Sequence, residues 1–164
     1  MELNKKQTNK IIFLDVDGVL NCSSTKDRCM GYIGIEDKKV SYLKQIVDTT
    51  KASIVLVSTW KYYWHKEKEM KWKQDEMANY LDDKLSEVGL YIWDKTKEVQ
   101  KRGKEIKNFI DELNARNIEV EKFVILDDEV LDYIEEGLSN NLVHTNYLIG
   151  LTINDSIKAI NTLK

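Results

Sequence analysis

The amino-acid sequence predicts an α/β fold in which a mainly parallel sheet lies between two layers of helices. Three short apolar runs, rich in β-branched residues, are typical of strands buried on both faces, and they fall at residues 11–14, 53–59 and 122–128. Segments with helical periodicity alternate with these runs along the chain. Such alternation indicates parallel strands joined by helices, and hence a Rossmann-like three-layer α/β/α architecture.

The remaining elements follow from periodicity and from turn residues. Helices are predicted where apolar residues recur every three or four positions, at 36–50, 74–87, 103–115 and 154–163. Residues 90–93 are interpreted as a short strand or an extended link, and residues 141–145 as a last strand. The polar residues 21–35 lack a steady period, and we expect a loop or a small hairpin flap there.

Length and composition indicate a soluble, single-domain protein. No linker or repeat divides the 164 residues, so we expect residues 1–164 to form one domain. The formal net charge of −3 does not favour a polyanionic partner over the whole surface, and two cysteines with two histidines form no zinc-site pattern. Met1–Lys10 lacks the apolar core of a secretion signal, and no apolar run approaches the ~18 residues of a membrane span. We therefore expect a cytoplasmic protein without a membrane partner.

Acidic and hydroxyl residues close three of the predicted strands: Asp15/Asp17, Ser58/Thr59 and Asp127/Asp128. In parallel α/β sheets the carboxyl ends of the strands share one edge, where ligands bind, so these groups are expected to converge. Four carboxylates gathered there repel one another unless a cation compensates their charge. With no histidine or cysteine ligand among them, the site suits a hard divalent ion, most simply Mg²⁺.

A magnesium site of this kind points to phosphoryl chemistry, because Mg²⁺ readily binds phosphate oxygens. A hydroxyl from Ser58 and a cation from segment 101–104 would complete a phosphate pocket. The expected partner is therefore a phosphorylated substrate.

These residues resemble the sequence elements of the haloacid dehalogenase-like (HAD-like) hydrolase superfamily, in its phosphatase branch. The opening pattern of the superfamily, an apolar strand followed by Asp-x-Asp-Gly-[Val/Thr], stands here as Asp15-Val16-Asp17-Gly18-Val19. The strand ending in Ser or Thr matches residues 54–58, and the strand ending in paired acids matches residues 123–128. With the Ser-Thr-Trp after the second strand, the chain is similar to the small phosphatase domains associated with bacterial and phage RNA-repair proteins.

The resemblance implies a Mg²⁺-dependent phosphatase that works through an aspartyl-phosphate. It implies that Asp15 is the nucleophile, and that Asp17 protonates the leaving oxygen and then activates water. Asp15, the backbone carbonyl of Asp17 and Asp128 would hold Mg²⁺. Asp127 would give close support to the metal, and Ser58 would form a hydrogen bond with the phosphoryl group.

The basic residue of the remaining element lies within Lys101-Arg102-Gly103-Lys104-Glu105-Ile106. Arg102 fits the Arg-Gly-x-Glu-Ile form of the narrower relatives, whereas Lys104 supplies the commoner residue type. Both are candidates for binding phosphate, with Arg102 preferred.

Structural alternatives exist for several of these residues. Asp127 or Asp128 could cap a helix that begins at Glu129, although one acid would suffice for a cap. Segment 127–136 holds six acids and no base, which favours neutralisation by a metal ion. Ser58, or its neighbour Thr59, could instead cap the helix that follows.

Segment 60–73, within a helical insert expected at 60–90, holds five aromatic residues and five lysines against two glutamates. One interpretation is a surface that stacks bases and binds phosphates of a nucleic-acid end. The other, which we favour, is that the aromatic residues pack onto the sheet while the lysines are solvated. The alternative to an enzyme is thus a non-catalytic HAD-fold module that binds a partner through this segment.

The spacing of the elements leaves no room for a large cap domain. In the superfamily such caps lie between the first and second elements or between the second and third, and here those gaps are residues 21–52 and 60–100. An open site favours a large or flexible phosphoester, such as a nucleic-acid end or a phosphoprotein, and a small nucleotide is a further candidate. Of these, we expect a nucleotide or a nucleic-acid end as the substrate.

Overall fold

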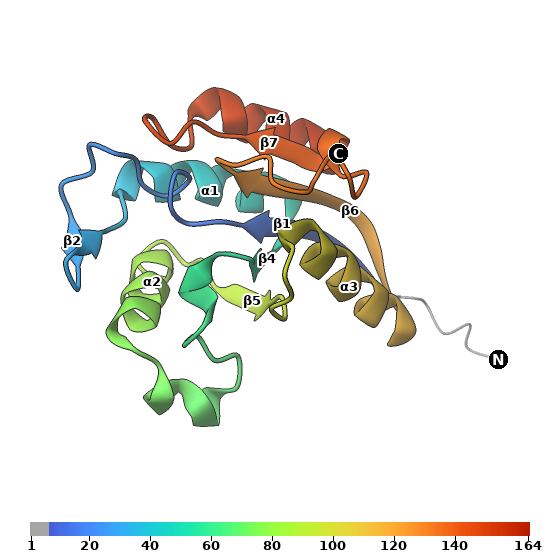
Figure 1. Cartoon of the computed structure of the whole chain (residues 1–164), viewed down its shortest axis with the longest axis horizontal. Coiled ribbons are helices and arrows are strands. Elements are labelled where there is room, and N and C mark those ends of the chain that lie inside the picture. The colour runs from blue at the N-terminus through green and yellow to red at the C-terminus, as the bar shows by residue number, and fades with distance from the viewer. Residues whose placement is uncertain (1–6) are drawn as a thin grey trace.

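The computed structural model describes residues 7–164, and its centre is a five-stranded sheet in the order β5-β4-β1-β6-β7 (Figure 1). Every neighbouring pair of strands in this sheet is parallel. The strands are β1 (Gln7–Leu14), β4 (Ser53–Leu56), β5 (Ile92–Lys95), β6 (Ile118–Asp127) and β7 (Leu142–His144). The predicted α/β architecture is confirmed. Residues 1–6, which include much of the polar stretch Met1–Lys10, lie outside the described residues.

Helices cover both faces of the sheet, namely α1 (Asp37–Thr50), α2 (Glu76–Ser86), α3 (Arg102–Ala115) and α4 (Ile153–Leu163) (Figure 1). Alternate side chains of β1 enter different cores. Ile12 and Leu14 pack with α1, α2 and α4, whereas Ile11 and Phe13 pack with α3. Burial on both faces explains why this strand is an unbroken apolar run. Within residues 7–164, no helix has both the length and the apolar character needed to cross a membrane.

Strand boundaries differ from the prediction where the sheet is polar or ends early. β1 and β6 begin before their apolar runs, and the pairing of Gln7 with Ile118 lies beyond the part of β1 that pairs with β4. In the first part of β6, residues 118–121, exposed positions alternate with half-buried ones, so polar residues are tolerated there. β4 ends at Leu56, earlier than predicted, because the chain turns into the short helix η1 (Thr59–Lys61).

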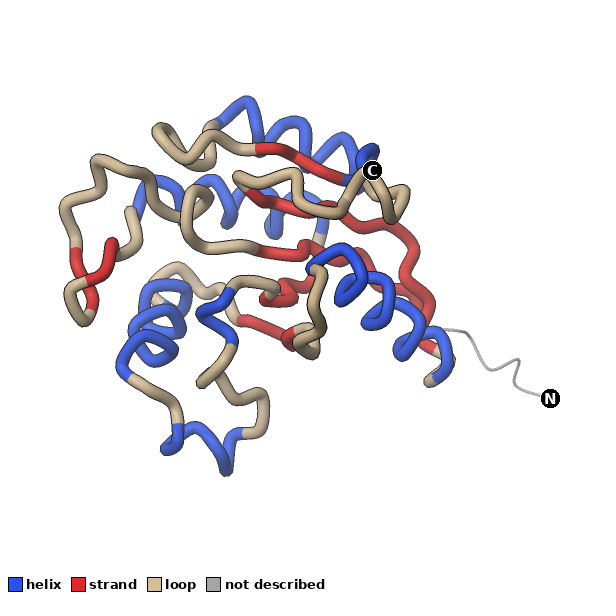
Figure 2. The backbone as a smooth tube through the Cα atoms, viewed as in Figure 1, coloured by secondary structure: helices blue, strands red, loops and turns tan. Residues whose placement is uncertain are grey.

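Two connections stand where a cap domain would be inserted. Between β1 and α1, the strands β2 (Arg28–Cys29) and β3 (Tyr32–Ile33) form an antiparallel hairpin, drawn in red apart from the central sheet in Figure 2. Between β4 and β5 the chain forms η1, η2 (Lys68–Lys73) and α2. A further short helix, η3 (Ser139–Asn141), precedes β7. The part of the chain that the structure describes therefore has no large cap domain.

Candidate active site

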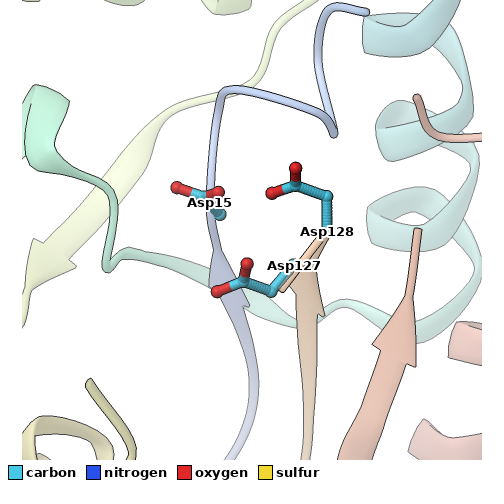
Figure 3. A group of neighbouring side chains, drawn as sticks. All are labelled: Asp15, Asp127 and Asp128. Carbon is cyan, nitrogen blue, oxygen red and sulfur yellow. The ribbon is translucent and has the colours of Figure 1, made fainter. Parts of the chain in front are cut away.

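Three carboxylates converge at the carboxyl end of the sheet (Figure 3). Asp15 follows β1, Asp127 is the last residue of β6, and Asp128 comes next. One carboxylate oxygen of each lies within 4.8 Å of the others. The backbone N–H of Asp15 donates to the carbonyl of Leu126 across 3.0 Å, which joins the ends of the two strands. Adjacent parallel strands thus place the three acids around one point.

Burial and mutual repulsion make this cluster unfavourable when all three groups are charged. Burial, together with the charge of Asp127, raises the pKa of Asp15 to about 8, although the Arg102 guanidinium opposes the shift. The same two causes, burial first, raise the pKa of Asp128. A divalent cation among these oxygens would relieve the repulsion, and an all-carboxylate donor set suits a hard ion such as Mg²⁺.

Asp127 is held by three hydrogen-bond donors from the protein. Its Oδ2 accepts from Nη1 of Arg102 at 2.8 Å and from the hydroxyl of Tyr133 at 2.6 Å. Its Oδ1 accepts from the backbone N–H of Glu129 at 2.9 Å. Asp127 therefore has less capacity left for a cation than Asp15 or Asp128, and its clearest structural task is to orient Arg102.

Arg102 and Lys104, the two candidates for the phosphate-binding cation, lie in different surroundings. Nη1 of Arg102 is 3.5 Å from Oδ1 of Asp15, and its side chain is largely buried. Lys104 is exposed, and no ion pair of its side chain occurs within residues 7–164. The start of α3 is fixed by Asp132, whose carboxylate accepts from the backbone N–H groups of Gly103 at 2.8 Å and Lys104 at 3.2 Å. Only Arg102 of the two reaches the acidic cluster.

The Glu of the Arg-Gly-x-Glu-Ile pattern has a structural role of its own. The buried carboxylate of Glu105 accepts hydrogen bonds from Nζ of Lys61 and from Oγ1 of Thr96, the latter at 2.8 Å. Because Lys61 belongs to η1 and Thr96 follows β5, this buried network fixes α3 against the ends of both neighbouring segments.

The six acids of segment 127–136 are largely neutralised by α3 and its flanking lysine. The pairs are Asp127 with Arg102, Asp132 with the N-terminal amides of α3, Glu135 with Lys101, and Glu136 with Lys107. The acid run therefore needs a metal ion less than its composition suggests. Residues 131–137 form turns, and no helix begins at Glu129 as considered in the alternative.

Asp17 is exposed and is held by two donors. Its Oδ1 accepts from Nδ2 of Asn21 at 2.9 Å, and its Oδ2 accepts from the indole N–H of Trp60 at 3.2 Å. The fully buried Asn21 also accepts from the backbone N–H of Gly18 and donates to the carbonyl of Gly34, both at 2.9 Å. The carboxylate of Asp17 is therefore aimed by side chains from two separate segments.

Gly18 has no room for a side chain. Its φ of +74° lies in the left-handed region, and a Cβ there would lie 2.4 Å from Cγ of Asp128. The hydroxyl of Thr145 donates to the carbonyl of Gly18 at 2.7 Å and holds the turn in place. The glycine of Asp-x-Asp-Gly thus lets the turn after β1 approach Asp128.

Ser58 is buried just beyond β4, beside β1, since the N–H of Val57 donates to the carbonyl of Leu14 at 3.0 Å. Its Oγ accepts from the backbone N–H of Trp60 at 3.3 Å, so Ser58 does cap the short helix η1. A serine hydroxyl that accepts one hydrogen bond still has its proton to donate. Thr59, in contrast, is exposed.

The aromatic segment 60–73 divides into packed and exposed residues. Trp60 and Trp64 are buried in the core, as favoured for this segment, whereas Tyr62, Tyr63 and Trp72 are exposed. Its lysines are largely engaged as well, because the partners of Lys61, Lys66 and Lys71 are Glu105, Asp94 and Asp82. The local excess of positive charge is therefore reduced by acids from other segments, which weakens the case for a phosphate-binding surface here.

Sequence reasoning missed Trp60, Asn21 and Tyr133 as residues that orient the site. Asn21 stands three positions after the glycine of the Asp-x-Asp-Gly motif. An amide side chain so near a motif is a signal, visible in the sequence, that the residue could orient the site. Trp60 and Tyr133 hold their carboxylates through contacts across 43 and 6 positions, and only the fold shows those contacts.

Comparison with known proteins agrees with this geometry. Neither a curated protein nor a solved structure gives a significant match to the chain. A family model described as the HAD domain in Swiss Army Knife RNA repair proteins matches residues 11–156. That match extends from β1 into α4 and includes every residue of the acidic cluster. The chain therefore belongs to the family of HAD domains found in Swiss Army Knife RNA repair proteins.

Proposed function

We propose that this chain is a Mg²⁺-dependent phosphatase that hydrolyses a phosphate monoester through an aspartyl-phosphate intermediate. The observation that carries the proposal is the position of Arg102, whose guanidinium lies 3.5 Å from Oδ1 of Asp15 at the edge of the three-carboxylate cluster. A nucleophile, a cation for the phosphoryl oxygens and a set of metal ligands thus lie within reach of one phosphoryl group. Membership of the HAD family supports the same chemistry.

The proposed reaction uses the two acids of the first motif in different roles. A carboxylate oxygen of Asp15 attacks phosphorus, the bond to the ester oxygen breaks, and Asp17 gives that oxygen a proton. Asp17 then takes a proton from water, whose oxygen attacks the phosphorus and releases phosphate from Asp15. The side chains of Ser58 and Arg102 donate hydrogen bonds to the phosphoryl oxygens throughout.

The metal would be held by Asp15, Asp128 and the backbone carbonyl of Asp17, with Asp127 behind them. When bound, Mg²⁺ neutralises charge on the carboxylates and on the phosphoryl group. The donor set fits the ion because it consists of oxygen atoms alone, and because burial and the charge of Asp127 raise the pKa of Asp15, an unfavourable effect that a bound cation would offset.

The proposed substrate is the phosphate at the end of a nucleic acid, and the proposed setting is the cytoplasm. The family description refers to RNA repair, and the described chain carries no large cap that would close the site over a small molecule. The formal net charge of −3 is consistent with recognition of an end rather than of a long stretch of backbone.

Phosphate release from terminally phosphorylated oligonucleotides and from an aryl phosphate, with Mg²⁺ or with EDTA, tests the proposal. We expect Mg²⁺-dependent release that Asp15→Asn abolishes while the circular dichroism spectrum is retained. Asp111→Asn, an exposed acid of α3, is the matched control and should keep wild-type rates. Equal rates for Asp15→Asn and wild type, or no release by wild type with any divalent ion, would refute the proposed function.

A further inference from the structure

A second feature of the site is a cavity of about 540 Å³ that adjoins Asp17. Besides Asp17, its walls come from four segments that are distant in sequence: the hairpin strand β3, the η1 segment, the start of α2 and the loop after β7. Four of the lining side chains are tyrosines, namely Tyr32, Tyr62, Tyr63 and Tyr147. We call this cavity the tyrosine pocket.

The tyrosine rings are accessible, because each of the four residues is between 46% and 65% exposed. Four large aromatic residues exposed around one cavity are unusual for a surface that contacts only water. Flat rings with a polar tip suit a planar, partly polar ligand, and aromatic side chains stack with any nucleobase.

The tyrosine pocket adjoins the proton donor of the proposed reaction. Asp17 lines it, together with Trp60, whose indole N–H holds Oδ2 of Asp17 at 3.2 Å. Because Asp17 gives its proton to the leaving oxygen, the group that carries this oxygen lies next to Asp17. The pocket is therefore in position to receive the leaving group, while Asp15 and Arg102 receive the phosphoryl group.

The charge of the pocket restricts its occupant. Asp17 and Asp75 line it, and no lysine or arginine does so within the described part of the chain. An anionic group would be repelled there whenever these acids are charged, which disfavours binding of the further phosphates of a nucleic-acid chain in the pocket. An uncharged base and sugar remain suitable, since the carboxylates can accept hydrogen bonds from amino and hydroxyl groups.

We propose that the tyrosine pocket binds the nucleoside that carries the terminal phosphate, and that the enzyme therefore requires this nucleotide to be unpaired. The inference rests on the proposed function and adds the part of the substrate that is recognised. A base stacked and paired in a duplex is unavailable to the pocket until it is displaced. Recognition then comes from stacking on the terminal base and depends little on the sequence of the strand.

The first experiment compares kcat/KM for single-stranded oligonucleotides that bear a 5′- or 3′-terminal phosphate with matched strands whose terminal nucleotide is abasic. We expect a preference of about tenfold or more for the strand that has the base, given the usual strength of base stacking on aromatic residues. We also expect a similar loss of rate when the terminal nucleotide is paired in a blunt duplex.

The variants Tyr63→Ala and Tyr147→Ala should reduce this preference to about twofold or less, whereas Tyr63→Phe and Tyr147→Phe should retain it because the ring remains. Tyr91→Ala is the matched control, an exposed tyrosine directly before β5 that lies outside the pocket, and it should keep the full preference. Retained preference in both alanine variants would overturn the proposal.

A binding measurement separates failure of this inference from failure of the proposed function. Asp15→Asn protein is titrated with the same two fluorescent strands, and anisotropy gives their dissociation constants without turnover. Tighter binding of the strand with the base supports the tyrosine pocket as a nucleoside site even if no phosphatase activity is found. Equal binding of the two strands, or a preference for a phosphotyrosine peptide over both of them, would overturn it.

Discussion

The indole N–H of Trp60 donates to Oδ2 of Asp17 across 3.2 Å, although the two residues are 43 positions apart in the sequence. Trp60 is itself buried and begins the aromatic segment that follows β4. The residue proposed to move protons is thus oriented by a segment whose Tyr62 and Tyr63 line the neighbouring tyrosine pocket. Proton transfer and leaving-group binding therefore depend on the same turn of the chain.

Replacing Trp60 by Phe should impair protonation of the leaving group. The variant removes one hydrogen bond to Asp17, and a hydrogen bond to a charged group is worth about 1.5–3 kcal/mol, so we expect kcat/KM for a nucleotide substrate, which reports the step that expels the leaving group, to fall by about tenfold or more. Formation of the aspartyl-phosphate from an aryl phosphate with a good leaving group needs no proton donor, so kcat/KM for that substrate should fall far less. Trp72→Phe, at an exposed site, serves as the control. Equal losses for both substrates would show that Trp60 does not act through Asp17.

Arg102 and Lys104 should differ sharply in their effect on activity. Arg102→Ala removes the cation 3.5 Å from Asp15 and leaves the carboxylate of Asp127 without its ion pair, so we expect kcat/KM to fall by about 10²–10³-fold. Lys104→Ala, which removes an exposed side chain, should stay within about twofold of wild type. Steady-state kinetics on one phosphorylated substrate decides between them. A larger loss for Lys104→Ala would assign the phosphate to that residue instead.

The stabilising effect of Mg²⁺ should grow with pH. Burial and the charge of Asp127 raise the pKa of Asp15 from 3.8 to about 8. Between these values the metal-free folded protein keeps a proton that the unfolded chain has lost, so its stability falls as the pH rises from about 4 to about 8. Because Mg²⁺ competes with that proton, the increase in Tm on adding Mg²⁺ should be larger at pH 8 than at pH 5.5.

At a free Mg²⁺ concentration of about 100 times Kd, the expected stabilisation is about 2.7 kcal/mol, or a rise in Tm of about 5–10 °C for a domain of this size. Differential scanning fluorimetry with Mg²⁺ and with EDTA provides the measurement. The pH dependence should be much reduced in Asp15→Asn. The same shift in Tm at both pH values would contradict the assignment of Asp15 as a ligand.

Gly18→Ala should have two effects: it should strain the backbone, and it should abolish Mg²⁺ binding. A Cβ at this position would lie 2.4 Å from Cγ of Asp128, so the carboxylate must move. Gly89→Ala is the control, because Gly89 also has a positive φ of +76° but has open space around the position of a Cβ. Gly89→Ala should lose about 1 kcal/mol of unfolding free energy through its positive φ, and Gly18→Ala should lose more, because the clash with Asp128 adds to the same backbone strain. Only Gly18→Ala should also lose the Mg²⁺-induced rise in Tm; if both respond to Mg²⁺ like wild type, Asp128 does not need this glycine.

The order of strands and helices could be predicted from the sequence because buried strands and amphipathic helices leave strong local patterns. The convergence of Asp15, Asp127 and Asp128 was also predictable, since parallel strands deliver their carboxyl ends to one edge. Strand limits were less predictable. β1 and β6 extend into polar residues because two paired strands can continue beyond the buried part of a sheet, and no apolar run marks that extension.

The contacts that orient the site were not predictable from local sequence. The chain gives no sign that Tyr133 would hold Asp127, or that Asp132 would bind the first amides of α3. The acid run 127–136 was interpreted as requiring a metal ion, because its composition cannot show that Lys101, Arg102 and Lys107 lie beside it. Because the basic residues come from a segment distant in sequence, only the fold shows that they pair with these acids. Composition alone therefore overstates the unpaired negative charge of the acid run.

The side-chain amide of Asn21 binds Asp17 and the carbonyl of Gly34, at the end of the hairpin β2–β3, with the same nitrogen. The hairpin also supplies Tyr32 to the tyrosine pocket. A displacement of the hairpin would stretch one of these two hydrogen bonds, so the orientation of the Asp17 carboxylate depends on the position of the hairpin. One asparagine therefore couples the placement of a pocket wall to the aim of a carboxylate.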